Sequence, residues 1–151
     1  MVALKKEEMQ SLAEDTVSIG LKRGANEAEA FTYQGLTPSV NIERGQIAKS
    51  SRVVDQGLGI RAIINRAVGF SYTNILDDKA AIEETVVRAL SAARASKPDE
   101  NWHSLAEKKP FSPTEGTYDK KIVQLQAEDL VSVASAMLNA AGKDTRVFPN
   151  E

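Results

Sequence analysis

The feature that most constrains the fold is a run of alternating side chains on either side of a short turn. From residue 58 to residue 64 an apolar side chain recurs at every second position, and the same period resumes in residues 68–73. The pair Asn65-Arg66 lies between the two runs and suits a two-residue turn. Because a period of two places successive side chains on opposite faces of a sheet, this stretch predicts two neighbouring strands.

A further alternating segment lies upstream of this hairpin. Val40 and Ile42 point to one face and the polar residues between them to the other, and Gly45 marks a turn. The connections between these segments are too short to hold a crossover helix. The strands are therefore expected to pair antiparallel.

The spacing of apolar residues predicts three helices, over residues 5–23, 78–96 and 119–141. Either Asp77 or Asp78 suits the N-cap of the second helix, because a carboxylate there accepts hydrogen bonds from the free amides of the first turn. Glu84 and Arg88 stand four residues apart on the solvent side of that helix. The third helix is expected to break around Gln126.

The order of these elements predicts an α+β fold: an N-terminal helix, an antiparallel β-meander over residues 38–74, then flanking helices packed on one sheet face. The apolar residues expected on the helix-covered face are Val40, Ile42, Leu58, Ile60, Val68 and Phe70. The residues expected on the opposite face are Gly57, Gly59, Arg61, Gly69, Ser71 and Thr73.

The opposite face is where we expect binding. Small residues leave the backbone accessible to an extended peptide or a partner's strand, and an arginine adds a fixed positive charge. We therefore take Arg61, Ser71 and Thr73 as candidate substrate-binding residues. Two alternatives remain open: Arg61 pairs with a nearby carboxylate, or this face packs against a further domain.

The length of 151 residues suits one domain, and we expect a single domain over residues 1–151 with a Pro-rich connection at 97–117. The last residues, 145–151, begin like a strand and then stop. We expect from this ending that the chain is a truncated part of a longer protein.

The composition argues against several classes of function. A net charge of -2 and a pI near 5.6 argue against nucleic-acid binding, which needs clustered Lys and Arg. No apolar run approaches the ~20 residues that span a bilayer, and no signal peptide is visible. The absence of cysteine excludes disulfides and thiolate metal sites, and it fits a reducing cytoplasm.

Three candidate chemical motifs have plainer interpretations. Residues 57–62 match the dinucleotide pattern GxGxxA, but the residues that follow alternate as a strand, whereas the motif must open a helix. His103 is the only histidine and cannot supply the three or four ligands of a zinc site. Glu27 and Glu29 would share a strand face, and a solvated face explains them better than acid–base chemistry.

Five segments in order resemble the N-terminal domain of TldD/PmbA proteins, a family of cytoplasmic, metal-dependent peptidase subunits also labelled modulators of DNA gyrase. The segments are residues 24–31 (GANEAEAF), 40–47 (VNIERGQI), 57–63 (GLGIRAI), 68–74 (VGFSYTN) and 89–96 (ALSAARAS). Beyond Pro98 the likeness is only a Pro-rich connection and a helix. The wording of the third and fourth segments leans toward the PmbA side of the family.

The resemblance implies a non-catalytic domain of a subunit that pairs with a second subunit, as a homodimer or heterodimer, and cleaves small or unfolded peptides. In TldD-type members a HExxxH zinc motif lies in the C-terminal half, and no such motif occurs here. We therefore expect no catalytic or metal-binding residue in this chain, zinc only in the full assembly, and no nucleic-acid or membrane partner. The alternative hypothesis is a stand-alone interaction module that modulates DNA gyrase.

Overall fold

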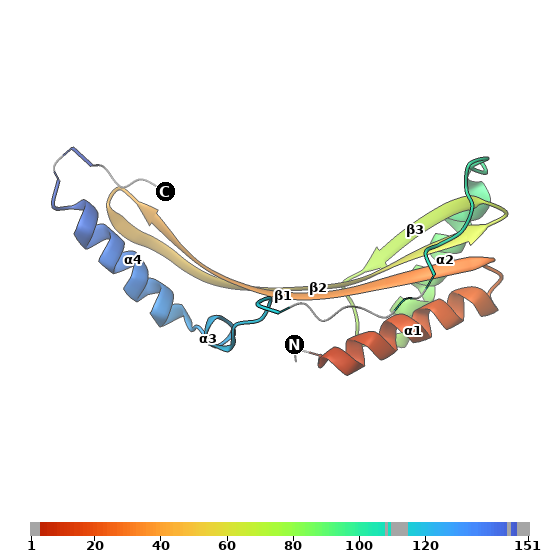
Figure 1. Ribbon diagram of the computed structural model, residues 1–151, viewed down its shortest axis with the longest axis horizontal. Helices are drawn as coiled ribbons and strands as arrows, with labels where there is room; N and C mark the ends of the chain where they lie inside the picture. Colours follow the sequence, from red (N-terminus) through yellow and green to blue (C-terminus); the bar gives the residue numbers. More distant parts are fainter. Residues whose placement is uncertain (1–3, 108, 110–114, 145, 148–151) are drawn as a thin grey trace. The chain divides into compact units, whose positions relative to one another are not determined.

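The computed structural model describes residues 4–107, 109, 115–144 and 146–147 (Figure 1). Its elements in chain order are α1 (Lys6–Lys22), β1 (Glu27–Glu43), β2 (Gln46–Ile64), β3 (Ala67–Thr73), α2 (Lys79–Ala95), α3 (Lys120–Val123) and α4 (Ala127–Ala141). The three strands form one sheet in the order β1-β2-β3. The α+β fold expected from the sequence is confirmed, with the helix bounds within one residue for the first two helices.

The chain divides into two compact units. The first comprises Met1–Gly35 and Asp55–Lys109, and the second comprises Leu36–Val54 and Pro110–Glu151. The long strands β1 and β2 contribute one half to each unit. The expectation of a single domain within a longer protein stays a prediction, and the strand expected at 145–151 lies largely outside the described residues.

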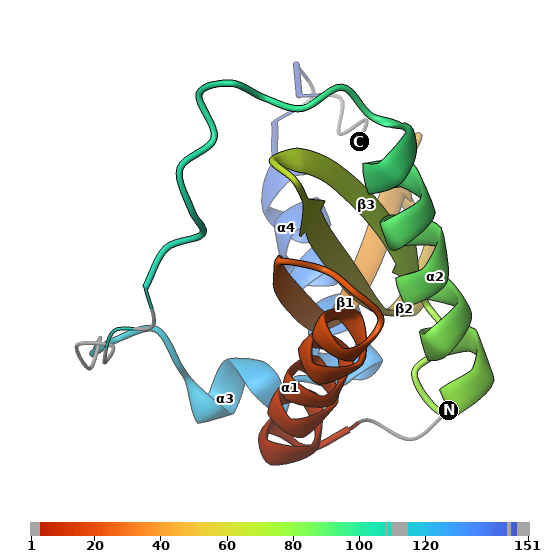
Figure 2. The same cartoon turned by 90° about the vertical axis from the view of Figure 1, so that its right-hand side faces the viewer.

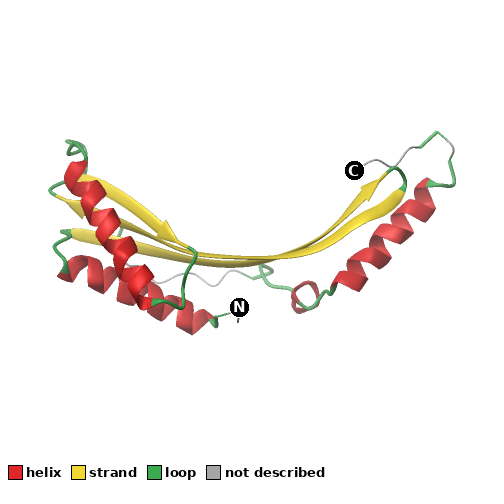
Figure 3. Ribbon diagram, turned by 180° about the vertical axis from the view of Figure 1, so that it is seen from behind, coloured by secondary structure: helices red, strands yellow, loops and turns green. Residues whose placement is uncertain are grey.

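The core of the first unit lies between the sheet and two helices. Figures 2 and 3 show α1 and α2 on the same side of the strands. The residues of its buried cluster are Ile60, Ala62, Val86, Ala89 and Leu90. Ile19 from α1 and Ile64 from β2 pack against this cluster while keeping some exposure. Fully burying an aliphatic side chain stabilises a fold by about 1.5–3 kcal/mol, so this layer is a main source of the unit's stability.

The turn between β2 and β3 sets the pairing of the two strands. Asn65 and Arg66 have φ angles of 50° and 66°, the left-handed backbone that a tight two-residue hairpin turn requires. Ile64 then pairs with Ala67, and the antiparallel register continues until Leu58 pairs with Thr73. The turn predicted from the sequence is confirmed.

This register corrects the assignment of faces on β3. Because Ile60 pairs with Ser71 and Leu58 with Thr73, these β3 residues lie on the helix-covered face, and Thr73 is buried. Phe70 pairs with Arg61 and is 60% exposed. The expected placement of Ser71, Thr73 and Gly69 opposite the helices was therefore wrong, as was the placement of Val68 and Phe70 beneath them.

The second unit contains the other half of the β1–β2 hairpin together with α3 and α4. Val40 and Ile42 are half-buried within this unit and do not belong to the core formed with α1 and α2. The break expected near Gln126 is confirmed, since α3 ends at Val123 and α4 begins at Ala127.

The second helix begins where a carboxylate can cap it. The Asp78 side chain accepts a hydrogen bond from the Ala80 amide at 2.8 Å. Of the two caps that the sequence allowed, the structure therefore uses Asp78.

Gly69 permits the closest approach between α2 and the sheet. A Cβ atom at this position would overlap the Ala89 carbonyl oxygen and the Ala93 amide nitrogen, both of which are helix backbone. At Gly57 the nearest atom to an added Cβ would be the Thr73 carbonyl oxygen at 3.5 Å, an ordinary contact.

We predict that Gly69→Ala lowers the free energy of unfolding by about 3 kcal/mol or more, because neither backbone can yield without separating α2 from β3. Gly57→Ala is the matched control and should change it by less than about 1 kcal/mol. Urea unfolding followed by circular dichroism measures both. Equal stability of the two variants would mean that α2 does not approach β3 this closely.

Candidate functional site

Arg61 lies on the sheet face opposite the helices, where it has two partners. Its Nη2 forms an ion pair with Glu29 Oε1, and its guanidinium carbon lies 6.0 Å from the centre of the Trp102 ring. The Nε atom is buried and has no hydrogen-bond partner among the described residues. The ion pair with Glu29 favours the interpretation that Arg61 is a strand arginine paired with a local carboxylate. A role for Arg61 in peptide contact stays a prediction.

Glu27 fastens the chain that follows α2 to the same face. Its carboxylate accepts hydrogen bonds from Trp102 Nε1 at 3.0 Å and from the Leu105 amide at 2.6 Å. The Asp99 amide donates to the Arg66 carbonyl oxygen at 3.0 Å. We call residues 99–105 the strap. Glu27 and Glu29 therefore have structural partners, which corrects the expectation of a merely solvated pair.

The hydrogen bonds to Glu27 change its acidity. The bond from Trp102, followed by the bond from the Leu105 amide, lowers the pKa of the Glu27 carboxyl below its ordinary value, because both bonds favour the charged form. His103, which lies within the strap, is exposed.

Aromatic side chains gather on this helix-free face. Phe31, Tyr33, Phe70 and Tyr72 are all exposed, and the rings of Phe70 and Tyr72 stack with centroids 6.4 Å apart. The Phe70 ring lies across Gly59, where an added Cβ would come within 3.1 Å of it. The sequence pattern did not predict this cluster, because the apolar character of Phe70 favoured the other face.

The Tyr33 hydroxyl ties β1 to β2 at one side of this cluster. It donates a hydrogen bond to Asp55 Oδ2 at 2.7 Å. That bond raises the pKa of Tyr33, since the carboxylate holds the phenolic proton.

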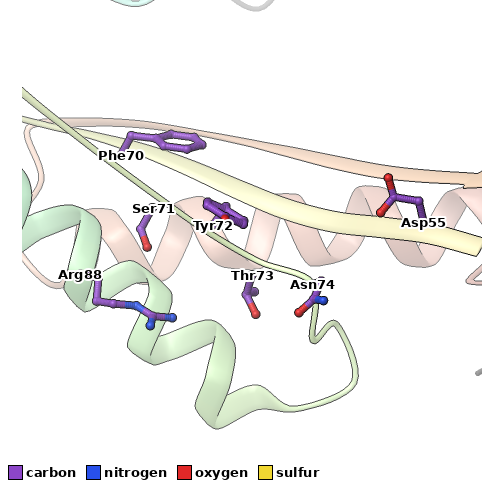
Figure 4. Close-up of a pocket in the computed structure, with 7 residues that line it drawn as sticks. All are labelled: Asp55, Phe70, Ser71, Tyr72, Thr73, Asn74 and Arg88. Atoms are coloured by element: carbon purple, nitrogen blue, oxygen red, sulfur yellow. The ribbon is translucent and has the colours of Figure 1, made fainter.

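An open depression of about 760 Å³ follows the outer edge of β3 (Figure 4). Its lining residues are Asp55, Phe70, Ser71, Tyr72, Thr73, Asn74 and Arg88. In Figure 4 the Arg88 side chain extends from α2 on the side of β3 where Ser71 and Thr73 lie, and the Phe70 ring lies on the opposite side. The depression therefore combines a cation, hydroxyl groups and aromatic rings along one strand.

The structure brings two of the three predicted site residues together. Ser71 and Thr73 both line the depression, whereas Arg61 does not. The cation beside them is Arg88, which sequence analysis placed only as a partner of Glu84. The spacing of residues along α2 could not reveal that Arg88 faces the edge of β3. Such spacing shows which side of a helix is exposed but does not specify which element lies opposite that side.

No group of three or more His, Cys, Asp or Glu side chains that could hold a metal ion occurs among the described residues. Nor does any helix in the described part of the chain have the length and apolar character needed to cross a membrane. Residues 57–62, which match the dinucleotide pattern, lie within β2 and do not open a helix.

Residues 28–93 match the family model described as PmbA/TldA metallopeptidase domain 1. Over these residues, 66 of the 151, the chain is similar to the first domain of the PmbA/TldD family. The match covers β1 from Ala28 onward, all of β2 and β3, and α2 up to Ala93, so it contains Arg61 and the residues that line the depression. It ends before the strap begins.

Solved structures share the fold. TldE from Thermococcus kodakarensis has a TM-score of 0.79 at 20% identity, covering 89% of this chain and 30% of that one. A candidate modulator of DNA gyrase from Bacteroides thetaiotaomicron has a TM-score of 0.80 at 24% identity, covering 95% and 33%. Another from Thermotoga maritima has a TM-score of 0.71 at 17% identity, covering 91% and 30%.

The chain thus spans about a third of the length of the solved proteins that it resembles. At these identities the likeness establishes the fold alone. No curated protein sequence matches the chain.

We predict that Arg61 and Glu29 stabilise the fold jointly. In a double-mutant cycle of Arg61→Ala and Glu29→Ala, the coupling free energy should be about 0.2–1 kcal/mol, the range of partly exposed ion pairs. Urea unfolding of the two single variants and the double variant gives this value. Strictly additive losses would show that the two side chains do not interact in solution.

Acid should release the strap. Because the folded pKa of Glu27 is lowered, its contribution to stability is present above the unfolded pKa and is lost as pH falls through the folded value. Trp102 is the only tryptophan, so its fluorescence reports this step. We predict an acid transition in the parent chain below pH 4.5, the ordinary value for Glu, that Glu27→Gln removes. An unchanged transition in that variant would contradict the assignment.

Proposed function

We propose that this chain serves as the N-terminal, non-catalytic domain of a cytoplasmic zinc metallopeptidase subunit, where it supports pairing with a second subunit and guides small or unfolded peptides. The observation that carries this proposal is the match of residues 28–93 to the first domain of a metallopeptidase family. The active site would lie in the remaining two thirds of such a subunit, with zinc bound there.

The geometry of the first unit supports a guiding role. The described sheet leaves β3 with a partner on one edge only, and residues 70–74 line a depression beside the other edge. An extended chain pairs with such an edge through its own backbone, so capture would tolerate many sequences. That tolerance suits a peptidase that acts on unfolded chains. Ser71 and Thr73 would contact the peptide there.

Arg61 would take part differently. Its contacts with Glu29 and Trp102 favour a role in holding the strap over the helix-free face. A direct contact between Arg61 and a peptide stays a hypothesis, and Arg61→Ala in the complete assembly would test it by weaker substrate capture at unchanged subunit pairing and thermal stability.

The complete subunit, purified with its partner, provides the main test. We predict zinc-dependent cleavage of an unfolded polypeptide such as casein, and slower cleavage after deletion of residues 1–151, with zinc content per subunit unchanged. Gel analysis follows cleavage, metal analysis follows zinc, and sedimentation follows pairing. Cleavage at an undiminished rate by the deletion variant with pairing intact would contradict the proposal.

The gyrase hypothesis has a separate readout. Two of the similar structures carry the description of a gyrase modulator. If the 151-residue chain alone altered DNA supercoiling by gyrase while the assembly cleaved no polypeptide, an interaction module would replace the peptidase domain as the better account.

A further inference from the structure

We propose that the free edge of β3 is a strand-addition site selective for extended peptides that carry a carboxylate, and that Arg88 binds this carboxylate. The inference rests on the proposed function, because it specifies which peptides the domain would guide. The carboxylate belongs either to an Asp or Glu side chain or to the C-terminus of the peptide.

Residues from both faces of β3 line the depression. Five consecutive residues, 70–74, line the depression. Phe70 and Tyr72 come from the helix-free face, and Ser71 and Thr73 come from the face toward α2. Because these residues are consecutive and alternate between the two faces, the depression lies along the strand. The geometry fits an added strand, whose alternate side chains lie on the two faces of the extended sheet.

Arg88 supplies positive charge on the α2 side of this edge. Its Nη2 donates to Thr85 Oγ1 at 3.2 Å, which holds the guanidinium in place. Its Nη1 lies 3.6 Å from Glu84 Oε1, beyond hydrogen-bond distance, and both side chains are more than half exposed. Glu84 therefore neutralises Arg88 only in part. The planar guanidinium keeps donors for a carboxylate, which it binds more strongly than a neutral group.

The other residues of the depression specify the rest of the ligand. The stacked rings of Phe70 and Tyr72 provide an apolar surface on the helix-free face, so alternate side chains of the peptide should be apolar or aromatic there. Asp55 also lines the depression and carries negative charge. Its charge repels a second carboxylate, so the acidic group of the peptide is directed to Arg88.

Fluorescence anisotropy with labelled octapeptides tests the site on the 151-residue chain. The probes have alternating Val and Thr residues with one central Glu, in amide-capped and free-acid forms, and matched peptides with Gln in place of Glu. We expect a carboxylate-bearing peptide to bind at least about tenfold more tightly than the capped Gln peptide. Tighter binding of the capped Glu peptide identifies a side-chain carboxylate, and tighter binding of the free-acid Gln peptide identifies a C-terminal one.

Variants assign the effect to Arg88. Arg88→Gln should abolish the tenfold preference and leave the affinity for the capped Gln peptide unchanged, whereas Arg88→Lys should keep part of the preference. Arg94→Gln removes the same charge from an exposed position on α2 that does not line the depression, and it should keep the preference in full. Circular dichroism confirms that each variant is folded.

Three outcomes would overturn the inference: equal binding of charged and neutral peptides, a preference that survives Arg88→Gln, or undiminished binding of a peptide with N-methylated backbone amides. The last result excludes pairing through the backbone. Each of them leaves the proposed function intact if deletion of the domain still slows cleavage by the full assembly. If deletion of the domain did not slow cleavage by the full assembly, the proposed function would be contradicted, however the peptides bind.

Discussion

The structure of the first unit depends on the close contact between α2 and β3 at Gly69. A residue without a side chain lets the helix backbone at Ala89 and Ala93 approach the strand directly. At this separation Leu58, Ile60 and Val86 are completely buried. A Cβ atom at residue 69 would displace the helix and expose these side chains, so one glycine controls most of the apolar layer.

This contact also determines which surfaces remain available for binding. The helix α2 packs on one face of β3, and the strap covers part of the helix-free face of the sheet through Glu27 on β1 and Arg61 on β2. The outer edge of β3 has no strand partner within the described sheet. A domain of this kind can bind an extended chain at its edge while its core stays intact, which is what guidance of a peptide toward a distant active site requires.

The sequence predicted the elements well because they depend on local patterns. The first two helices lie within one residue of their predicted bounds, and the cap at Asp78 follows from local hydrogen bonding. The two faces of β3 were assigned wrongly because Val68 and Phe70 were placed beneath the helices on the basis of their apolar side chains. The predicted two-residue turn was sufficient to assign the faces correctly. It pairs Ile64 with Ala67, so Ile60 pairs with Ser71 and these two residues share a face. The hydrogen bond between Glu27 and Trp102 joins residues 75 positions apart, and no local pattern encodes it.

The central claim is that β3 pairs along one edge and leaves the other free. Amide hydrogen exchange of the 151-residue chain, measured residue by residue with NMR spectroscopy, tests it most directly. In an antiparallel edge strand, successive amides point alternately to the partner strand and away from it. We predict slow and fast exchange in alternation along Ala67–Thr73. Uniformly slow exchange along this strand would mean that its outer edge is already covered, and it would contradict the account.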